Sequence, residues 1–283
     1  MRKSLITTAA LGALVAPSFV FAAEAAPAPD LTVAYNVGLY SQYIFRGLTQ
    51  TDRHPAIQGG IDLTHSSGFY LGAWASNVSW LRDPYGENQT DSSTSYYSKG
   101  GRMELDLYGG YRYTFSSGLG IDVGALRYQY PGSLRPSTVA ANTTELYGAL
   151  NYGWVQAKLS SVVTDTAWGW GKHNGAGTDD ARGTYYAEIN TTVPIGDLIG
   201  GGALTGVTGL VHIARQDFNG KANEYASYTD YKLGLQKSFS EGVLNGVNIG
   251  GYWTKANTNG SAWTYDTKNI GDSTGTAYIQ KTF

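Results

Sequence analysis

The sequence predicts an all-β fold, a transmembrane antiparallel up-and-down β-barrel of about twelve strands. Three observations lead to this fold class. Behind an N-terminal export signal, the chain is a series of extended segments whose side chains alternate between apolar and polar. No later apolar run approaches the ~20 residues that a membrane-spanning helix requires. The connections between the segments alternate between short and long, as they do in bacterial outer-membrane barrels.

The N-terminus has the pattern of a secretory signal peptide. Arg2 and Lys3 precede an apolar run that ends at Pro17, and small residues precede a cleavage position after Ala22. The run is too short to span a bilayer. We therefore expect residues 1–22 to be a signal peptide and residues 23–283 to form a single outer-membrane β-barrel domain.

Composition and charge exclude several classes of protein. The chain has no cysteine, which rules out disulfides and thiolate metal sites. Without Arg2 and Lys3, the 20 basic residues become 18 against 22 acidic ones, a net charge of −4 that argues against a nucleic-acid partner. The 38 glycines and 22 tyrosines are typical of β-structure with close strand contacts and aromatic belts.

The clearest strand is predicted over 102–115. Met103, Leu107 and Phe115 share one face of this segment, whereas Glu104 and Asp106 share the other. The same alternation predicts further strands at 31–46, 56–64, 69–80, 119–130, 143–153, 154–165, 183–193, 203–215, 225–239, 247–256 and 274–283. The total of about twelve is an even number, as bacterial barrels require.

The connections predict which way the barrel stands in the membrane. Those near 65–68, 115–118, 153, 194–202 and 240–246 are short or moderate, and those at 47–55, 81–101, 131–142, 166–182, 216–224 and 257–273 are longer on average. Short turns on the side of the termini and long loops outside are the order expected when both termini lie in the periplasm. Phe115, Phe239 and Phe283 then end strands at the periplasmic interface, where aromatic rings are favoured.

A segment near the N-terminus resembles a known family. Its motifs are FRG at 45–47, TQTD at 49–52, PAIQGG at 55–60, GFY at 68–70 and WASNV at 74–78. This segment closely resembles the opening of the TorF-like porin family, also labelled Gcw-chp, and the terminal Lys281-Thr-Phe283 agrees with it. The resemblance implies a bacterial outer-membrane barrel assigned as a porin. Phe283 also resembles the terminal signal that the outer-membrane assembly machinery recognises.

Strand parity predicts which charged side chains line the interior. The expected pore-lining residues are Arg46, Asp62, Arg102, Glu104, Asp106, Arg112, Asp122, Glu145, Lys158, Glu188, Asp230 and Lys232. Five are basic and seven acidic, so no strong ion preference follows. These side chains either line an aqueous path or pair with one another and seal it.

The functional prediction is a porin-like channel for the passive diffusion of small hydrophilic solutes, surrounded by outer-membrane lipid. The alternative is a non-conducting barrel whose extracellular loops bind a partner or ligand. An enzyme is not expected, because His54, His65 and His173 lie in predicted loops or turns and no serine is placed beside a histidine with an orienting group. No cofactor and no metal are predicted.

Overall fold

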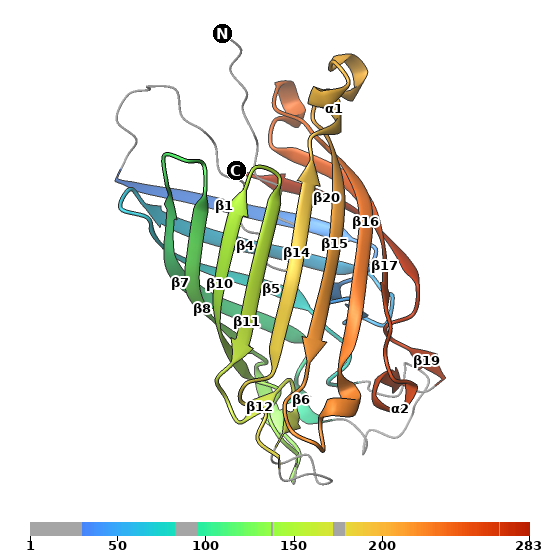
Figure 1. The fold of residues 1–283 in the computed structure, drawn as a ribbon. Coiled ribbons are helices and arrows are strands. Elements are labelled where there is room, and N and C mark those ends of the chain that lie inside the picture. Colours follow the sequence, from blue (N-terminus) through green and yellow to red (C-terminus); the bar gives the residue numbers. More distant parts are fainter. Residues whose placement is uncertain (1–29, 83–95, 137, 172–178, 266) are drawn as a thin grey trace.

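The computed structural model describes residues 30–82, 96–136, 138–171, 179–265 and 267–283. Twelve long antiparallel strands close into one barrel (Figure 1). They are β1 (Leu31–Tyr40), β4 (Ala56–His65), β5 (Phe69–Asn77), β7 (Met103–Thr114), β8 (Gly120–Gln129), β10 (Thr143–Tyr152), β11 (Val155–Val162), β14 (Tyr185–Val193), β15 (Val207–Asp217), β16 (Tyr228–Ser238), β17 (Val247–Ala256) and β20 (Thr274–Thr282). Each corresponds to one expected segment, so the predicted fold class is confirmed. The predicted signal peptide lies outside the described residues.

The barrel closes without a free edge. Strands that follow one another along the chain are neighbours around the ring, and β1 pairs with β20 to complete it. The closing register runs from Asn36 opposite Thr282 to Tyr40 opposite Tyr278. Closure matters because lipid tails cannot hydrogen-bond to an open strand edge.

Short elements occupy the connections. The end that holds the short turns, called the turn end, carries α1 (Ile195–Leu198), η2 (Gly202–Leu204) and η4 (Gly242–Leu244). The opposite loop end carries β2 (Ile44–Phe45), β3 (Leu48–Thr49), β6 (Tyr97–Gly100), β9 (Gly132–Leu134), β12 (Thr166–Ala167), β13 (Trp170–Gly171), η3 (Glu224–Ala226), α2 (Gly260–Trp263), β18 (Thr264–Tyr265) and β19 (Lys268–Asn269). Both barrel termini lie at the turn end (Figure 1), as the order of short and long connections predicts. Nowhere in the described ranges is there a helix of sufficient length and apolar character to cross a membrane.

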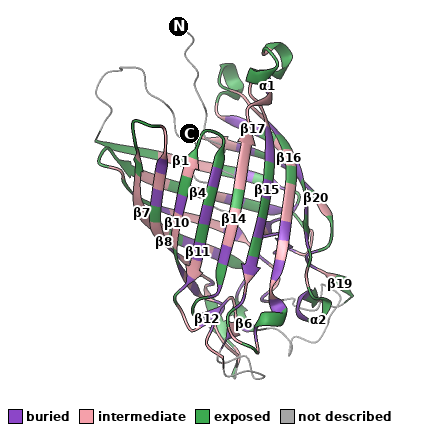
Figure 2. Ribbon diagram, viewed as in Figure 1, coloured by how far each residue is buried: buried purple, intermediate pink, exposed green. Residues whose placement is uncertain are grey.

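The two faces of the strands differ in burial. In Figure 2 the strands are striped, because exposed and buried residues alternate along them. Leu39 and Leu233 on the outer face are each 60% exposed, whereas Glu104 and Asn248 on the inner face are 0% exposed. The outside of the barrel is therefore an apolar surface, and the polar side chains are turned inwards.

Inward tyrosines lie against glycines of neighbouring strands. A Cβ at Gly72 would overlap the ring of Tyr108, and a Cβ at Gly250 would overlap the ring and hydroxyl of Tyr278. The missing side chains leave the space in which each ring lies flat on the wall. This packing explains part of the joint abundance of glycine and tyrosine in the sequence.

Aromatic rings surround the turn end on the outside. Phe69 is 63% exposed, Trp154 49% and Phe283 58%, and all three lie at strand ends on this side. The ring of Phe283 stacks on that of Tyr35, with centroids 5.2 Å apart. These positions suit the headgroup level of a bilayer.

Candidate functional site

Between β1 and β4, residues 42–51 fold into the barrel. β2 and β3 pair as a small hairpin in which Phe45 lies opposite Leu48. Arg46 and Gly47 form its tip, with φ of 47° and 78°. Two residues at positive φ are what a tight two-residue hairpin turn requires. Residues 44–49 are called the inserted hairpin below.

This finding corrects two expectations from the sequence. A strand that extends to Arg46 is wrong, because β1 ends at Tyr40 and the chain then turns inwards. An external loop over 47–55 is wrong for residues 47–51, which are buried, whereas His54 and Pro55 are exposed. The alternating sequence pattern continues past Tyr40, although Ser41 and Gln42 form a bend before β2 becomes extended again at Ile44. A period of two therefore cannot distinguish a barrel strand from a hairpin inside the barrel.

Apolar packing holds the inserted hairpin in place. The ring centroid of Phe45 lies 5.5 Å from those of Tyr128 and Trp168. Leu48 is buried in an apolar cluster at the loop end that includes Trp263. The inserted hairpin therefore belongs to the packed interior at the loop end, where it takes up space that a wide pore would leave to water.

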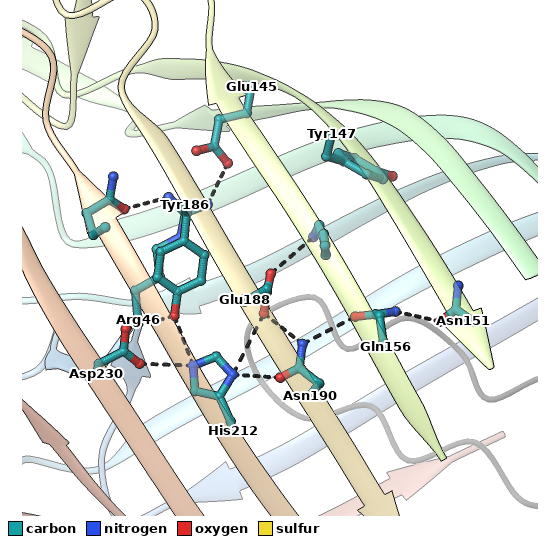
Figure 3. A network of polar contacts seen from close by, with 12 residues as sticks. Arg46, Glu145, Tyr147, Asn151, Gln156, Tyr186, Glu188, Asn190, His212 and Asp230 are labelled. Carbon is teal, nitrogen blue, oxygen red and sulfur yellow. Dashed lines mark hydrogen bonds and ion pairs between the residues drawn. The ribbon is translucent and has the colours of Figure 1, made fainter. Parts of the chain in front are cut away.

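The guanidinium of Arg46 reaches the wall opposite β1. Nη2 donates to Glu145 Oε2 at 2.7 Å, and Nη1 donates to Gln216 Oε1 at 2.8 Å (Figure 3). Its Cζ atom lies 4.2 Å from the ring centroid of Tyr186 and 4.9 Å from that of Trp168. Burial lowers the pKa of Arg46, but Glu145 together with Tyr128 and Tyr186 outweighs this effect and raises the pKa above the ordinary value.

Acidic side chains gather beside this contact. Glu104 accepts hydrogen bonds from the hydroxyls of Tyr43 at 2.7 Å and Tyr130 at 2.8 Å. Asp106 Oδ1 and Glu145 Oε1 are buried and have no hydrogen-bond partner among the described residues. Burial raises the pKa of Tyr43 and of Tyr130 well above the ordinary tyrosine value, and the adjacent Glu104 raises both further.

A second polar network runs along the inner wall of β14, β15 and β16 (Figure 3). The hydroxyl of Tyr186 donates to Asp230 Oδ2 at 2.9 Å, and Asp230 Oδ1 lies 3.0 Å from His212 Nε2. His212 Nδ1 lies 2.6 Å from Asn190 Oδ1, and Asn190 Nδ2 donates to Glu188 Oε2 at 2.8 Å. Because these residues satisfy one another, the network forms a continuous polar stripe inside the barrel.

A third group lies nearer the turn end. The hydroxyl of Tyr70 donates to Asp122 Oδ1 at 2.6 Å, and Arg112 Nε donates to Asp122 Oδ2 at 3.2 Å. Tyr108 on β7 donates across β5 to Asp62 Oδ1 on β4 at 2.6 Å. Charged and phenolic groups therefore occupy the interior along much of its length.

The structure brings eleven of the twelve predicted residues into the interior. They are Arg46, Asp62, Glu104, Asp106, Arg112, Asp122, Glu145, Lys158, Glu188, Asp230 and Lys232. Arg102 is the exception, because it precedes β7 and is exposed at the loop end. Strand parity does not hold beyond the end of a paired strand. These eleven residues comprise four basic and seven acidic ones, and their role in lining a pore stays a prediction.

The pore-lining residues expected from the sequence are all charged, and they leave out the uncharged side chains that contact them. Tyr43, Tyr128, Tyr186 and Gln216 all contact the charged residues of the interior. The strand pattern could have identified Tyr128, Tyr186 and Gln216, because each shares the inward face of its strand. Tyr43 lies outside any barrel strand, so its position could not be inferred from parity.

Comparisons with known proteins identify a family. The family model described as "Bacterial protein of unknown function (Gcw_chp)" matches residues 24–283. No curated protein sequence matches the chain.

Several solved outer-membrane proteins are similar in fold. The KdgM porin shares 10% identity at a TM-score of 0.45, over 89% of this chain and 98% of that one. OprD from Pseudomonas aeruginosa shares 12% identity at a TM-score of 0.37, over 89% of this chain and 66% of that one. OccK5 (OpdH) from the same organism shares 15% identity at a TM-score of 0.40, over 90% and 67%. Similarities this low carry no information about solute or activity.

The location follows from the barrel itself. A closed ring of strands with an apolar outer face and aromatic rings at its turn end is built to span a lipid bilayer. In bacteria such barrels lie in the outer membrane. With the family model matching nearly the whole chain, this bacterial outer-membrane barrel belongs to the Gcw_chp family.

Proposed function

We propose that the protein is a narrow outer-membrane channel through which small hydrophilic solutes diffuse. The observation that carries this proposal is the charged interior, with seven acidic and four basic residues turned inwards. Burying charges is costly even when they are paired, and apolar side chains would fill a purely structural barrel at least as well. Charges inside a closed barrel are explained by a polar path through it.

The inserted hairpin would set the width of this path. Arg46 at its tip contacts β10 and β15, so the segment crosses the interior instead of following the wall beneath it. The surplus of carboxylates would make the path mildly acidic and favour cations over anions. The resemblance of residues 39–80 to TorF-like porins supports the same function.

The proposal includes no catalytic step. Phe283, exposed at the end of β20, is the residue that we propose the outer-membrane assembly machinery recognises.

Reconstitution into planar bilayers tests the channel. Folded protein is expected to give discrete conductance steps, and liposomes that contain it are expected to swell in small sugars. Absence of both from protein that is folded and inserted would refute diffusion through the barrel.

A sealed barrel is the second candidate, and one observation favours it. At the loop end, inward side chains are almost completely buried, with Glu145 and Tyr128 each 1% exposed. In this case the long loops would bind a partner or ligand, and the ion pairs would hold the interior closed. The absence of conductance, together with strong destabilisation when an interior charge is removed, would support it.

A further inference from the structure

The inserted hairpin places the guanidinium of Arg46 in a cage of polar and aromatic side chains. The guanidinium of Arg46 has two hydrogen bonds to the wall, to Glu145 and Gln216, at 2.7 and 2.8 Å. The rings of Tyr186 and Trp168 lie within 5 Å of its Cζ atom. A carboxylate, an amide oxygen and aromatic faces are the groups that recognise guanidinium and ammonium ions.

The four cage residues come from three barrel strands and one loop-end segment, all remote from the hairpin in sequence. Glu145 lies on β10, Tyr186 on β14 and Gln216 on β15, and Trp168 lies in the connection between β11 and β14. Barrel-strand pairing places Glu145, Tyr186 and Gln216 without the inserted hairpin, whereas the ring of Trp168 also packs on Phe45. Three of the four cage residues therefore belong to the wall, and Arg46 is the occupant of the cage.

The wall beside the cage carries more carboxyl groups than Arg46 binds. Glu104, Asp106 and Glu145 form the acidic group, and within the described ranges Arg46 is the cation bonded to it. Asp106 is 5% exposed and Glu145 1% exposed, yet one oxygen of each has no hydrogen-bond partner. Buried acceptors of this kind favour an additional or competing donor.

The backbone of Arg46 is fixed by the hairpin turn, whereas its side chain is held by the cage. Arg46 has a φ of 47°, a left-handed backbone that non-glycine residues seldom adopt and that persists only where contacts impose it. This φ belongs to the two-residue turn between β2 and β3, so a competing solute has to displace the side chain of Arg46 and not the backbone of the inserted hairpin.

From these observations we infer that Glu145, Gln216, Tyr186 and Trp168 form a binding site for small organic cations of the guanidinium and ammonium class. Arg46 is the internal ligand of this site and competes with the solute for it. A role of this site in the selectivity of a channel rests on the proposed function. The binding of the cation does not depend on the proposed function.

The binding test uses the full-length protein in detergent and ethylguanidinium as the probe. Arg46→Ala removes the internal ligand and is expected to bind the probe saturably by calorimetry. Concentrations up to about 20 mM suffice, far below the molar range in which guanidinium denatures proteins. Wild-type protein should bind at least about tenfold more weakly, because Arg46 occupies the site. Arg46→Gln, which keeps a polar tip, replaces Arg46→Ala if that variant does not fold.

Two controls isolate the cage. Arg46→Ala combined with Glu145→Gln should lose binding, and Arg182→Ala should behave as wild type, because Arg182 is an exposed arginine paired with Asp180. Equal concentrations of sodium chloride and of urea should produce no saturable signal. A folded Arg46→Ala variant that does not distinguish ethylguanidinium from sodium chloride would overturn the inference.

A conductance measurement separates this inference from the proposed function. Ethylguanidinium should block the current through Arg46→Ala channels at the concentrations at which it binds, and sodium chloride should not. Saturable binding in a barrel that never conducts would refute the channel and leave the cation site standing. Conductance without binding would refute the site and leave the channel standing.

Discussion

Arg46 and Glu145 are 99 positions apart in the sequence, and Arg46 Nη2 donates to Glu145 Oε2 at 2.7 Å. Around the ring, β4, β5, β7 and β8 lie between β1, which leads into the inserted hairpin, and β10, which carries Glu145. This ion pair therefore ties the tip of the hairpin to a distant part of the wall. Both side chains are buried, at 7% and 1% exposure, so the pair is shielded from solvent.

The first prediction concerns the coupling of this pair. Arg46→Ala should lower the free energy of unfolding by about 3–5 kcal/mol, because it leaves Glu145 buried without its counter-charge. Adding Glu145→Gln should restore part of the loss, so the double variant is less destabilised than the sum of the single ones. Urea unfolding from lipid vesicles measures all three. Simple additivity would show that the pair does not hold the hairpin.

The second prediction concerns the contact between the tip of the inserted hairpin and β16. A Cβ at Gly47 would lie 2.5 Å from the Cβ of Asp230, so Gly47→Ala should push the tip away from β16 and raise the single-channel conductance. Gly153→Ala is the matched control, because Gly153 also has a positive φ, of 57°, but no atom lies within 4 Å of the added Cβ. An equal conductance for both variants would argue against a constriction at the tip.

Alkaline pH should release the inserted hairpin. The pKa of Tyr43 is raised by burial and then by Glu104, so the folded state favours the neutral phenol. The stabilisation from Tyr43 is complete below the unfolded tyrosine pKa of about 10 and declines as the pH rises above it towards the raised value. Protease accessibility of residues 41–55 should therefore increase above about pH 10.

Tyr43→Phe tests the origin of this effect. The variant loses the hydrogen bond to Glu104 but has no proton to release, so the part of the alkaline transition that Tyr43 contributes should disappear. Tyr130→Phe should act in the same way through its own bond to Glu104. A transition unchanged in the double variant would assign it to other groups.

Arginine substitutions distinguish an open from a sealed interior. Arg112 lies inside, with its guanidinium 4.3 Å from the ring of Tyr70, so Arg112→Gln should shift the reversal potential towards cation selectivity. Arg102→Gln is the control, since Arg102 is exposed at the loop end. A loss of several kcal/mol of stability in Arg112→Gln without current in either variant would instead support the sealed barrel.

The last prediction concerns the lipid-facing surface. Leu159 lies in the middle of β11 and is 53% exposed, so Leu159→Arg should cost about 2–4 kcal/mol in a bilayer. Val243, 98% exposed in a connection at the turn end, offers the matched site, and Val243→Arg should change stability little. Equal costs at both positions would contradict a lipid-facing β11.

The alternation of apolar and polar residues determined the barrel, because each strand meets lipid on one side and the interior on the other. The segments expected at 102–115 and 247–256 correspond to β7 and β17 with bounds that agree to within one residue. Parity within a strand also placed Glu104 and Asp106 inside, since a period of two leaves only one choice of face.

Only the tertiary structure determined the path of the connections and the contacts that they make inside the barrel. The position of Arg46 depends on Glu145, Gln216 and Tyr186, which are brought together by ring closure and not by any local pattern. The sequence pattern wrongly placed Arg102 inside the barrel for a related reason. Whether Arg102 is inside or exposed depends on where the pairing of β7 with its neighbours ends. Local periodicity indicates whether a side chain faces lipid or the interior. Contacts across the barrel join residues that are far apart in the chain, so the local sequence pattern does not predict them.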